Sequence, residues 1–192
     1  MLYKTAKQRF FVYFILIHIT RETQTCGKQW DAVYYMWDEV GQSGINKIML
    51  IGEYNHTLDD KKRLSLPSKF RKELGKDIVI THGLDHCLFI YSKTEWKKFA
   101  EKLGELSMGQ ADSRSFTRFI LGSAVEATFD KAGRILIPDF LKKFAKLGNS
   151  VVVAGIGNRV ELWNEKKWNS YQKGLEENAD TLAEKLGDIG MI

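Results

Sequence analysis

One pattern occurs twice in this chain of 192 residues, first as LDDKKRLSLP at residues 58–67 and then as FDKAGRILIP at residues 129–138. The prolines that close the two stretches, Pro67 and Pro138, are the only two in the sequence. The offset between them also joins Asp59 to Asp130 and Arg63 to Arg134. Self-similarity at a fixed offset indicates two copies of one structural unit. We place these copies at residues 53–96 and 124–168.

The repeated stretch predicts a hairpin followed by a helix. Short β-prone segments flank a polar turn, where Gly133 supplies a residue that adopts positive φ and the first copy has Lys62 instead. Asp59 and Asp130 stand where an aspartate side chain accepts hydrogen bonds from turn amides two residues on. The closing prolines suit the first turn of a helix, because the N–H that proline lacks is not needed there. The expected turn-shaping residues are Asp59, Asp130, Gly133, Pro67 and Pro138.

Other apolar runs predict the rest of each copy. A short helix follows each proline, and two buried strands joined by a glycine-containing turn come next. Ser92 with Glu95 forms a capping-box pattern before a further helix, and Asn164 caps the final one. The expected segments are helices at 68–74, 139–147 and 95–103, strands at 78–81, 87–91, 151–154 and 160–163, a helical spacer at 97–123, and a C-terminal helix with an acidic tail at 169–192.

The size of the repeat decides how the copies must pack. A unit of about 45 residues has too little interior to be stable alone. Two copies in one chain solve this by packing against each other. We therefore predict an α+β fold in which two tandem β-α repeats form one pseudo-twofold β-barrel domain, with helices between and after the repeats.

Charge is concentrated at the first motif. The whole chain carries a formal net charge of +5, but residues 61–76 hold seven basic residues against Glu73 alone, a net charge of +6. The last nineteen residues carry a net charge of −4. A basic window of this kind suits a polyanion partner such as nucleic acid.

Enzymatic chemistry and cofactor binding find little support in the residues. Two cysteines cannot form a disulfide framework or fill a four-ligand zinc site. His82 and His86 flank a glycine in a turn, so they would not share a helical face as metal ligands do. The stretch at residues 155–157 lacks the third glycine of a dinucleotide loop. We expect no catalytic residue, no metal, no cofactor and no evident small-molecule ligand.

Residues 1–48 differ in composition from the rest of the chain. They hold nine of the 23 aromatic residues, and the apolar run at residues 10–19 is too short to span a bilayer. We expect residues 1–48 to be a non-native N-terminal extension, upstream of a true start at Met49. A genuine extension that packs or anchors is the alternative. We expect no membrane partner.

From Met49 onward the sequence closely resembles the MraZ proteins, bacterial regulators of the cell-division and cell-wall gene cluster. The resemblance is carried by three motifs, Asp59–Pro67, Asp130–Pro138 and Gly155-Ile156-Gly157-Asn158-Arg159. It implies two repeats of the SpoVT-AbrB-like swapped-hairpin fold, with the repeated motif forming the DNA-contacting surface. Lys62 departs from the family, which commonly has glycine at this position.

The resemblance and the basic window together predict a sequence-specific DNA-binding regulator of transcription that acts as a repressor. Its partners would be double-stranded promoter DNA with direct repeats and further copies of itself in a homo-oligomeric ring. It would be cytoplasmic and associated with the nucleoid. The expected DNA-binding residues are Lys61, Lys62, Arg63, Arg71, Lys131 and Arg134.

Three alternatives stay open from the residues alone. Arg63 and Arg134 could each pair with the aspartate of their own turn and do nothing else. The chain could be a non-enzymatic assembly or adaptor protein whose basic face binds an acidic protein partner. It could also be an antitoxin-like regulator of the same fold, although such proteins usually carry one repeat per chain.

Overall fold

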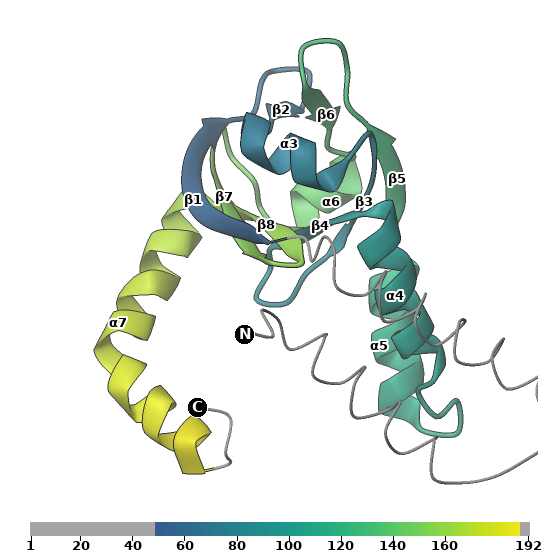
Figure 1. Cartoon of the computed structure of the whole chain (residues 1–192), viewed down its shortest axis with the longest axis vertical. Helices are drawn as coiled ribbons and strands as arrows, with labels where there is room; N and C mark the ends of the chain where they lie inside the picture. The colour runs from purple at the N-terminus through teal and green to yellow at the C-terminus, as the bar shows by residue number, and fades with distance from the viewer. Residues whose placement is uncertain (1–48, 189–192) are drawn as a thin grey trace, which may run out of the picture. The chain divides into compact units, whose positions relative to one another are not determined.

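The computed structural model describes residues 49–188 (Figure 1). The strands are β1 (Leu50–Thr57), β2 (Arg63–Ser65), β3 (Asp77–His82), β4 (Leu88–Ser92), β5 (Val125–Thr128), β6 (Arg134–Leu136), β7 (Ser150–Gly157) and β8 (Arg159–Asn164). The helices are α3 (Ser68–Leu74), α4 (Lys93–Gly104), α5 (Ala111–Leu121), α6 (Asp139–Phe144) and α7 (Glu165–Asp188). The prediction for residues 1–48 concerns residues outside the described part of the chain.

The strands form a six-stranded antiparallel sheet in the order β1-β7-β8-β4-β3-β5 and a separate two-stranded sheet of β2 and β6. The first strand of each repeat pairs with the third strand of the other, β1 with β7 and β5 with β3. This exchange confirms the α+β fold of two swapped-hairpin repeats. The order of the large sheet has two ends, β1 and β5, so we do not call the barrel closed.

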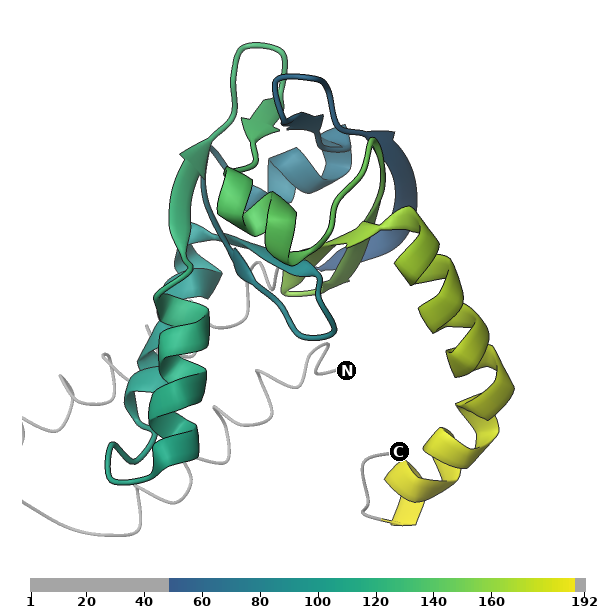
Figure 2. The ribbon, with the colours of Figure 1, turned by 180° about the vertical axis from the view of Figure 1, so that it is seen from behind.

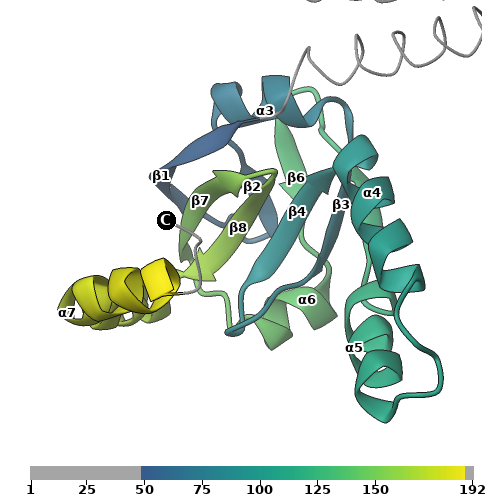
Figure 3. The same ribbon diagram turned by 60° about the horizontal axis from the view of Figure 1, so that its bottom comes forward.

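The pairing register reveals the pseudo-twofold relation directly. In the small sheet Leu64 lies opposite Ile135, its counterpart in the second repeat. In the large sheet Phe89 lies opposite its own counterpart, Glu161. Figure 3 shows β4 beside β8 at the middle of the large sheet, with α7 on one side and the α4–α5 pair on the other. The axis that relates the repeats therefore passes through both sheets.

The hairpin predicted within each repeat is only partly present. Residues 54–58 and 64–66 do flank a turn, but in the described chain their direct strand contact is a single bridge between Leu58 and Leu64. The longer ladders run to the other repeat instead. Pairing of β2 with β6 places Leu64 opposite Ile135, and both side chains are completely buried.

The predicted helix boundaries need two corrections. Pro67 and Pro138 occupy the N-cap positions of α3 and α6, one residue before the first helical turn, and their carbonyls accept the amides of Arg71 and Lys142. The spacer at 97–123 is two antiparallel helices rather than one, because residues 105–110 interrupt it. The predicted caps are confirmed, since Ser92 accepts from the amide of Glu95 and Asn164 accepts from that of Lys167.

The main core lies between the concave face of the large sheet and the layer formed by β2, β6, α3 and α6. Phe70 of α3 and Leu141 of α6 are fully buried against strand residues such as Ile80 and Val153. Seen from its two sides, the β2–β6 pair has α3 on one side and α6 on the other (Figures 1 and 2). Neither repeat could cover its own apolar strands without the helix and strands of the other.

Between residues 49 and 188, the model contains no helix with the length and apolar character needed to cross a lipid bilayer.

Truncation of Leu64 tests whether the small sheet joins the repeats. We expect Leu64→Ala to lower the free energy of unfolding by about 2–5 kcal/mol, because it leaves a cavity in a fully buried site. Urea unfolding followed by circular dichroism should show one transition, shifted to lower urea.

The control is Leu136→Ala on the neighbouring strand, where the side chain is 58% exposed and little should change. Two separate transitions for Leu64→Ala would show that the repeats fold independently.

Candidate nucleic-acid interface

The first turn (residues 59–63) is organised by the carboxylate of Asp59. Its Oδ1 accepts the Arg63 amide at 2.8 Å, and its Oδ2 accepts Nε of the Arg63 guanidinium at 2.8 Å. Nη2 of Arg63 also lies 2.8 Å from Oδ2. One aspartate therefore closes the turn and fixes the direction of the arginine side chain.

The second turn (residues 130–134) repeats this arrangement. Oδ1 of Asp130 accepts the amides of Ala132 and Arg134, each at 2.9 Å. Oδ2 accepts Nε of Arg134 at 2.9 Å and lies 2.8 Å from its Nη2. The predicted bond to the amide two residues on is present at Asp130, whereas Asp59 accepts the amide of Arg63, four residues on. Pairing of each arginine with the aspartate of its own turn was one of the open alternatives.

The residue before each arginine adopts the left-handed conformation, with φ of 60° at Lys62 and 72° at Gly133. For a lysine this costs roughly 1–3 kcal/mol. Cross-repeat contacts compensate at Lys62, whose carbonyl accepts the amide of Ile137 at 2.9 Å and whose amine lies 2.5 Å from the carboxylate of Asp139. The departure from glycine at this position is therefore accommodated by the second repeat.

The two turns lie side by side at one end of the described structure (Figures 1 and 2). The strands that leave them, β2 and β6, pair directly, and Nη1 of Arg134 lies 3.9 Å from Oδ2 of Asp59 in the first turn. Positions far apart in the sequence thus contribute two equivalent arginines to one surface.

Each arginine side chain is partly exposed to solvent. The side chains of Arg63 and Arg134 are 32% and 34% exposed. The aspartate takes the edge formed by Nε and Nη2, which leaves the end formed by Nη1 and the second hydrogen of Nη2. That end is the part of a guanidinium that makes bidentate contacts with guanine or phosphate. Pairing with aspartate therefore orients the arginine without using all its donors.

The lysines predicted with these arginines differ in placement. Lys61 and Lys131 are exposed in the turns, whereas Lys62 is engaged by Asp139. Arg71 of α3 is half-buried, and its guanidinium lies against Gly133 of the second turn.

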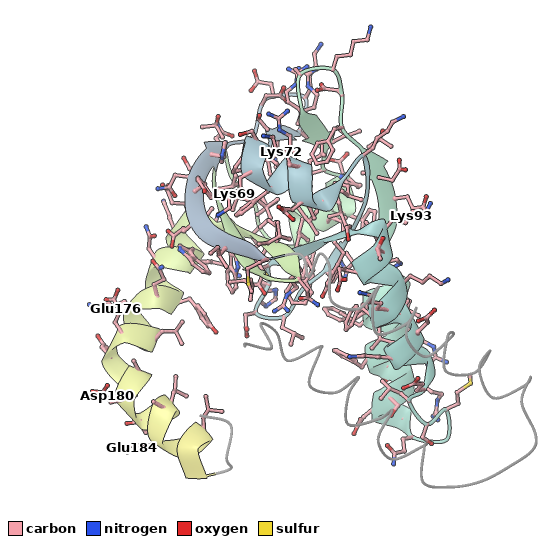
Figure 4. All side chains as sticks on the ribbon, viewed as in Figure 1. Lys69, Lys72, Lys93, Glu176, Asp180 and Glu184 are labelled. Carbon is pink, nitrogen blue, oxygen red and sulfur yellow. The ribbon has the colours of Figure 1, made fainter. Side chains whose placement is uncertain are left out.

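Further basic side chains flank the turns on both helices. Lys69 and Lys72 are exposed on α3, and Lys72 is the nearer of the two to the turns (Figure 4). On α6, Lys143 is exposed at the position equivalent to Lys72. Sequence reasoning missed the α6 lysine, although the offset between the repeats, applied to Lys72, would have found it.

Hydrogen bonds lower the pKa of both turn aspartates. For Asp59 the largest cause is the Arg63 amide, followed by the Arg63 side chain. For Asp130 the Arg134 amide and then its side chain act in the same way. Both carboxylates are therefore charged at neutral pH and remain paired with their arginines.

His82 and His86, which the sequence does not favour as metal ligands, lie away from the turns and contact aromatic rings. The ring of His82 stacks on Phe144 with centroids 3.8 Å apart, and that of His86 lies 5.5 Å from the same ring. Burial lowers the pKa of His82, which favours the neutral imidazole. Across residues 49–188, His, Cys, Asp and Glu side chains nowhere gather in a group of three or more that could hold a metal ion.

A comparison with protein families shows which family the chain belongs to. A family model described as "MraZ protein, putative antitoxin-like" matches residues 49–119 and again residues 120–188. The chain belongs to the MraZ family. The two matches divide the chain into the same two repeats that the sequence offset and the strand exchange define.

Curated MraZ relatives match over their full length. Proteins named transcriptional regulator MraZ from Oenococcus oeni and Caldanaerobacter subterraneus subsp. tengcongensis are 49% and 46% identical over 143 residues. One from Pediococcus pentosaceus is 46% identical over the same length. Each alignment covers 74% of this chain and 100% of the relative. Membership of MraZ supports the broad function class, a regulator of transcription.

The turn aspartates predict how stability depends on pH. Because their pKa values are lower in the folded chain than in the unfolded chain, the unfolded chain binds more protons in acid. Their stabilisation is thus present above the unfolded value near pH 4 and is lost as the pH falls through the folded pKa. In the double variant Asp59→Asn, Asp130→Asn, the free energy of unfolding should fall less steeply as the pH is lowered below about 4.

Chemical unfolding at a series of pH values measures this dependence. The control is Asp60→Asn, an exposed residue of the same turn that accepts no hydrogen bond from the described residues. An equal flattening in the control would assign the effect to general charge rather than to the two turns.

Proposed function

We propose that this MraZ protein regulates transcription by binding double-stranded promoter DNA through the paired turns, with Arg63 and Arg134 as the principal contacts. The observation that supports this most is the placement of two equivalent, oriented arginines on one surface. Lys61 and Lys131 add exposed positive charge in the same turns, and Lys62 adds more when a phosphate competes for it with Asp139.

The proposed chemistry separates positioning from sequence reading. Exposed lysines on the turns and on α3 and α6 would neutralise phosphates, which fixes orientation but carries no sequence information. The open ends of the two guanidiniums would donate to O6 and N7 of guanine in the major groove. The aspartates keep the arginines extended and partly immobilised, so less side-chain entropy is lost on binding.

A single copy offers few phosphate contacts, so we infer that several copies act together in a ring. Head-to-tail copies repeat their turns in one orientation, which suits direct repeats in DNA, whereas a two-fold dimer suits a palindrome. Simultaneous engagement of adjacent repeats raises affinity through effective concentration. The division and cell-wall gene cluster is the proposed target, repression the proposed outcome, and the cytoplasmic nucleoid the proposed location.

Two exposed apolar surfaces support head-to-tail assembly, because such contacts need two different surfaces on each copy. One is a stripe on α7 formed by residues 39–42% exposed, namely Tyr171, Leu175, Leu182 and Leu186. The other lies at the tip of the α4–α5 pair, with Leu106, Met108 and Phe116 exposed. The acidic row of Glu176, Asp180 and Glu184 occupies the side of α7 that faces away from α4 and α5 (Figure 4).

Removal of one turn arginine tests DNA contact. Arg63→Ala should abolish the shift of a DNA fragment taken from upstream of the protein's own gene. A lost bidentate contact costs about 1–3 kcal/mol per copy, so the affinity should fall at least roughly tenfold. Arg134→Ala should act in the same way, as measured by electrophoretic mobility shift at fixed salt.

The control is Lys93→Ala, which removes one positive charge at the start of α4, away from the turns (Figure 4). Unchanged binding by both arginine variants would refute the assignment of the turns. Purification of the wild-type chain without nucleic acid, together with failure to shift any fragment, would favour the adaptor alternative instead.

Charge on the α7 stripe tests assembly. The double variant Leu175→Glu, Leu182→Glu should convert the ring to smaller species, because two carboxylates would have to be buried in an apolar contact. Light scattering coupled to size-exclusion chromatography measures the mass. The matched control, Asp180→Asn with Glu184→Gln on the opposite side of the helix, should leave the mass unchanged; a ring retained by the leucine variant would exclude the stripe from the interface.

A further inference from the structure

Arg71 belongs to the first repeat, yet it covers the turn of the second. Gly133 is buried, although its neighbours Lys131 and Ala132 in the same turn are exposed. A Cβ atom placed on Gly133 would overlap Nη1 of Arg71 and lie 2.6 Å from its Cζ. The arginine guanidinium is therefore the group that lies over the backbone of Gly133.

The burial of Arg71 does not suit a phosphate contact. Its Nε is buried and has no hydrogen-bond partner within residues 49–188, and the side chain as a whole is only partly exposed. A buried Nε does not reach a phosphate of the DNA backbone, so this edge of the guanidinium is not available for such a contact. Arg71 instead uses its planar head for packing, which an arginine does well because its guanidinium is weakly hydrated.

The equivalent place in the first turn is held differently. Lys62 stands where the second turn has Gly133, and it is tied to α6 by the ion pair with Asp139, whose side chain is 64% exposed. Exposed ion pairs are weak and are screened by salt. The second turn has a half-buried side chain packed on it, so the two turns are supported unequally by the opposite repeats.

We propose that Arg71 is a positioning residue for DNA recognition: it holds the Gly133 turn so that Arg134 meets the bases in one orientation. The proposal rests on the DNA-binding function proposed above. Arg134 follows Gly133 directly, and its amide and side chain are both bonded to Asp130, so a change of φ at Gly133 would move the guanidinium. When a base-contacting side chain is held in one orientation, the protein distinguishes between DNA sequences better, while its overall affinity for DNA changes less.

Discrimination between two DNA fragments tests this role. Binding of Arg71→Met, Arg71→Lys and the wild-type chain is measured at several salt concentrations, on the fragment upstream of the gene and on a scrambled fragment of equal length. We expect both variants to bind the upstream fragment about tenfold more weakly than the wild type. Their affinity for the scrambled fragment, and the slope of log affinity against log salt concentration, should not change. Arg71→Lys should not restore the affinity for the upstream fragment, because lysine keeps the positive charge but lacks the planar guanidinium.

The matched control is Lys142→Met, the equivalent position in the second repeat, which should leave the ratio of the two affinities unchanged. A phosphate role for Arg71 would give the opposite pattern. Arg71→Met would then weaken both fragments equally and reduce the salt slope by about 0.9, while Arg71→Lys would bind like the wild type. That result overturns the proposal. A wild-type chain that does not distinguish the fragments refutes the DNA-reading function instead.

A thermal unfolding cycle tests the packing without DNA. Asparagine tolerates positive φ, so Gly133→Asn mainly adds a side chain where Arg71 lies. We expect this substitution to lower the unfolding midpoint in the wild-type background and to lower it less in the Arg71→Met background. Equal shifts in the two backgrounds would show that Arg71 does not cover the turn and would also overturn the proposal.

Discussion

The structure depends on one strand pair, formed where β2 of the first repeat meets β6 of the second. Leu64 and Ile135 face each other there and are fully buried. This contact lies on the pseudo-twofold axis, so each repeat supplies an equivalent apolar side chain to the other. Without it the turns, which directly precede these strands, would have no fixed relation to each other.

The Asp–Arg pair gives each turn a second function beyond closure. An aspartate that accepts both a backbone amide and a guanidinium shapes the backbone and directs the side chain at once. The partly exposed pair has little value as a surface salt bridge. Its value in this MraZ protein lies in geometry, because it presents the unused end of each arginine at one end of the fold.

The sequence was sufficient to predict the two repeats, the helix caps and the residues that form the polar turns. Each of these depends on residues close in the chain: an aspartate four residues before an arginine, a serine three residues before a glutamate, and a residue of positive φ in a tight turn. The local hairpin is only partly present because its strands form their longer ladders with the other repeat. Lys143 of α6 was not predicted because the basic window lies in the first copy, and in the second copy only the turn residues Lys131 and Arg134 were expected to contact DNA.

The sequence by itself thus determined that two equivalent units exist and that each carries an arginine at a polar turn. Only the tertiary structure decided that the strands exchange between the repeats, that both arginines lie on one surface, and that Arg71 lies over Gly133 rather than among the exposed cations. The physical reason is distance along the chain. Local hydrogen bonds are specified by neighbouring residues, whereas burial is settled by contacts between segments of different repeats, far apart in the sequence.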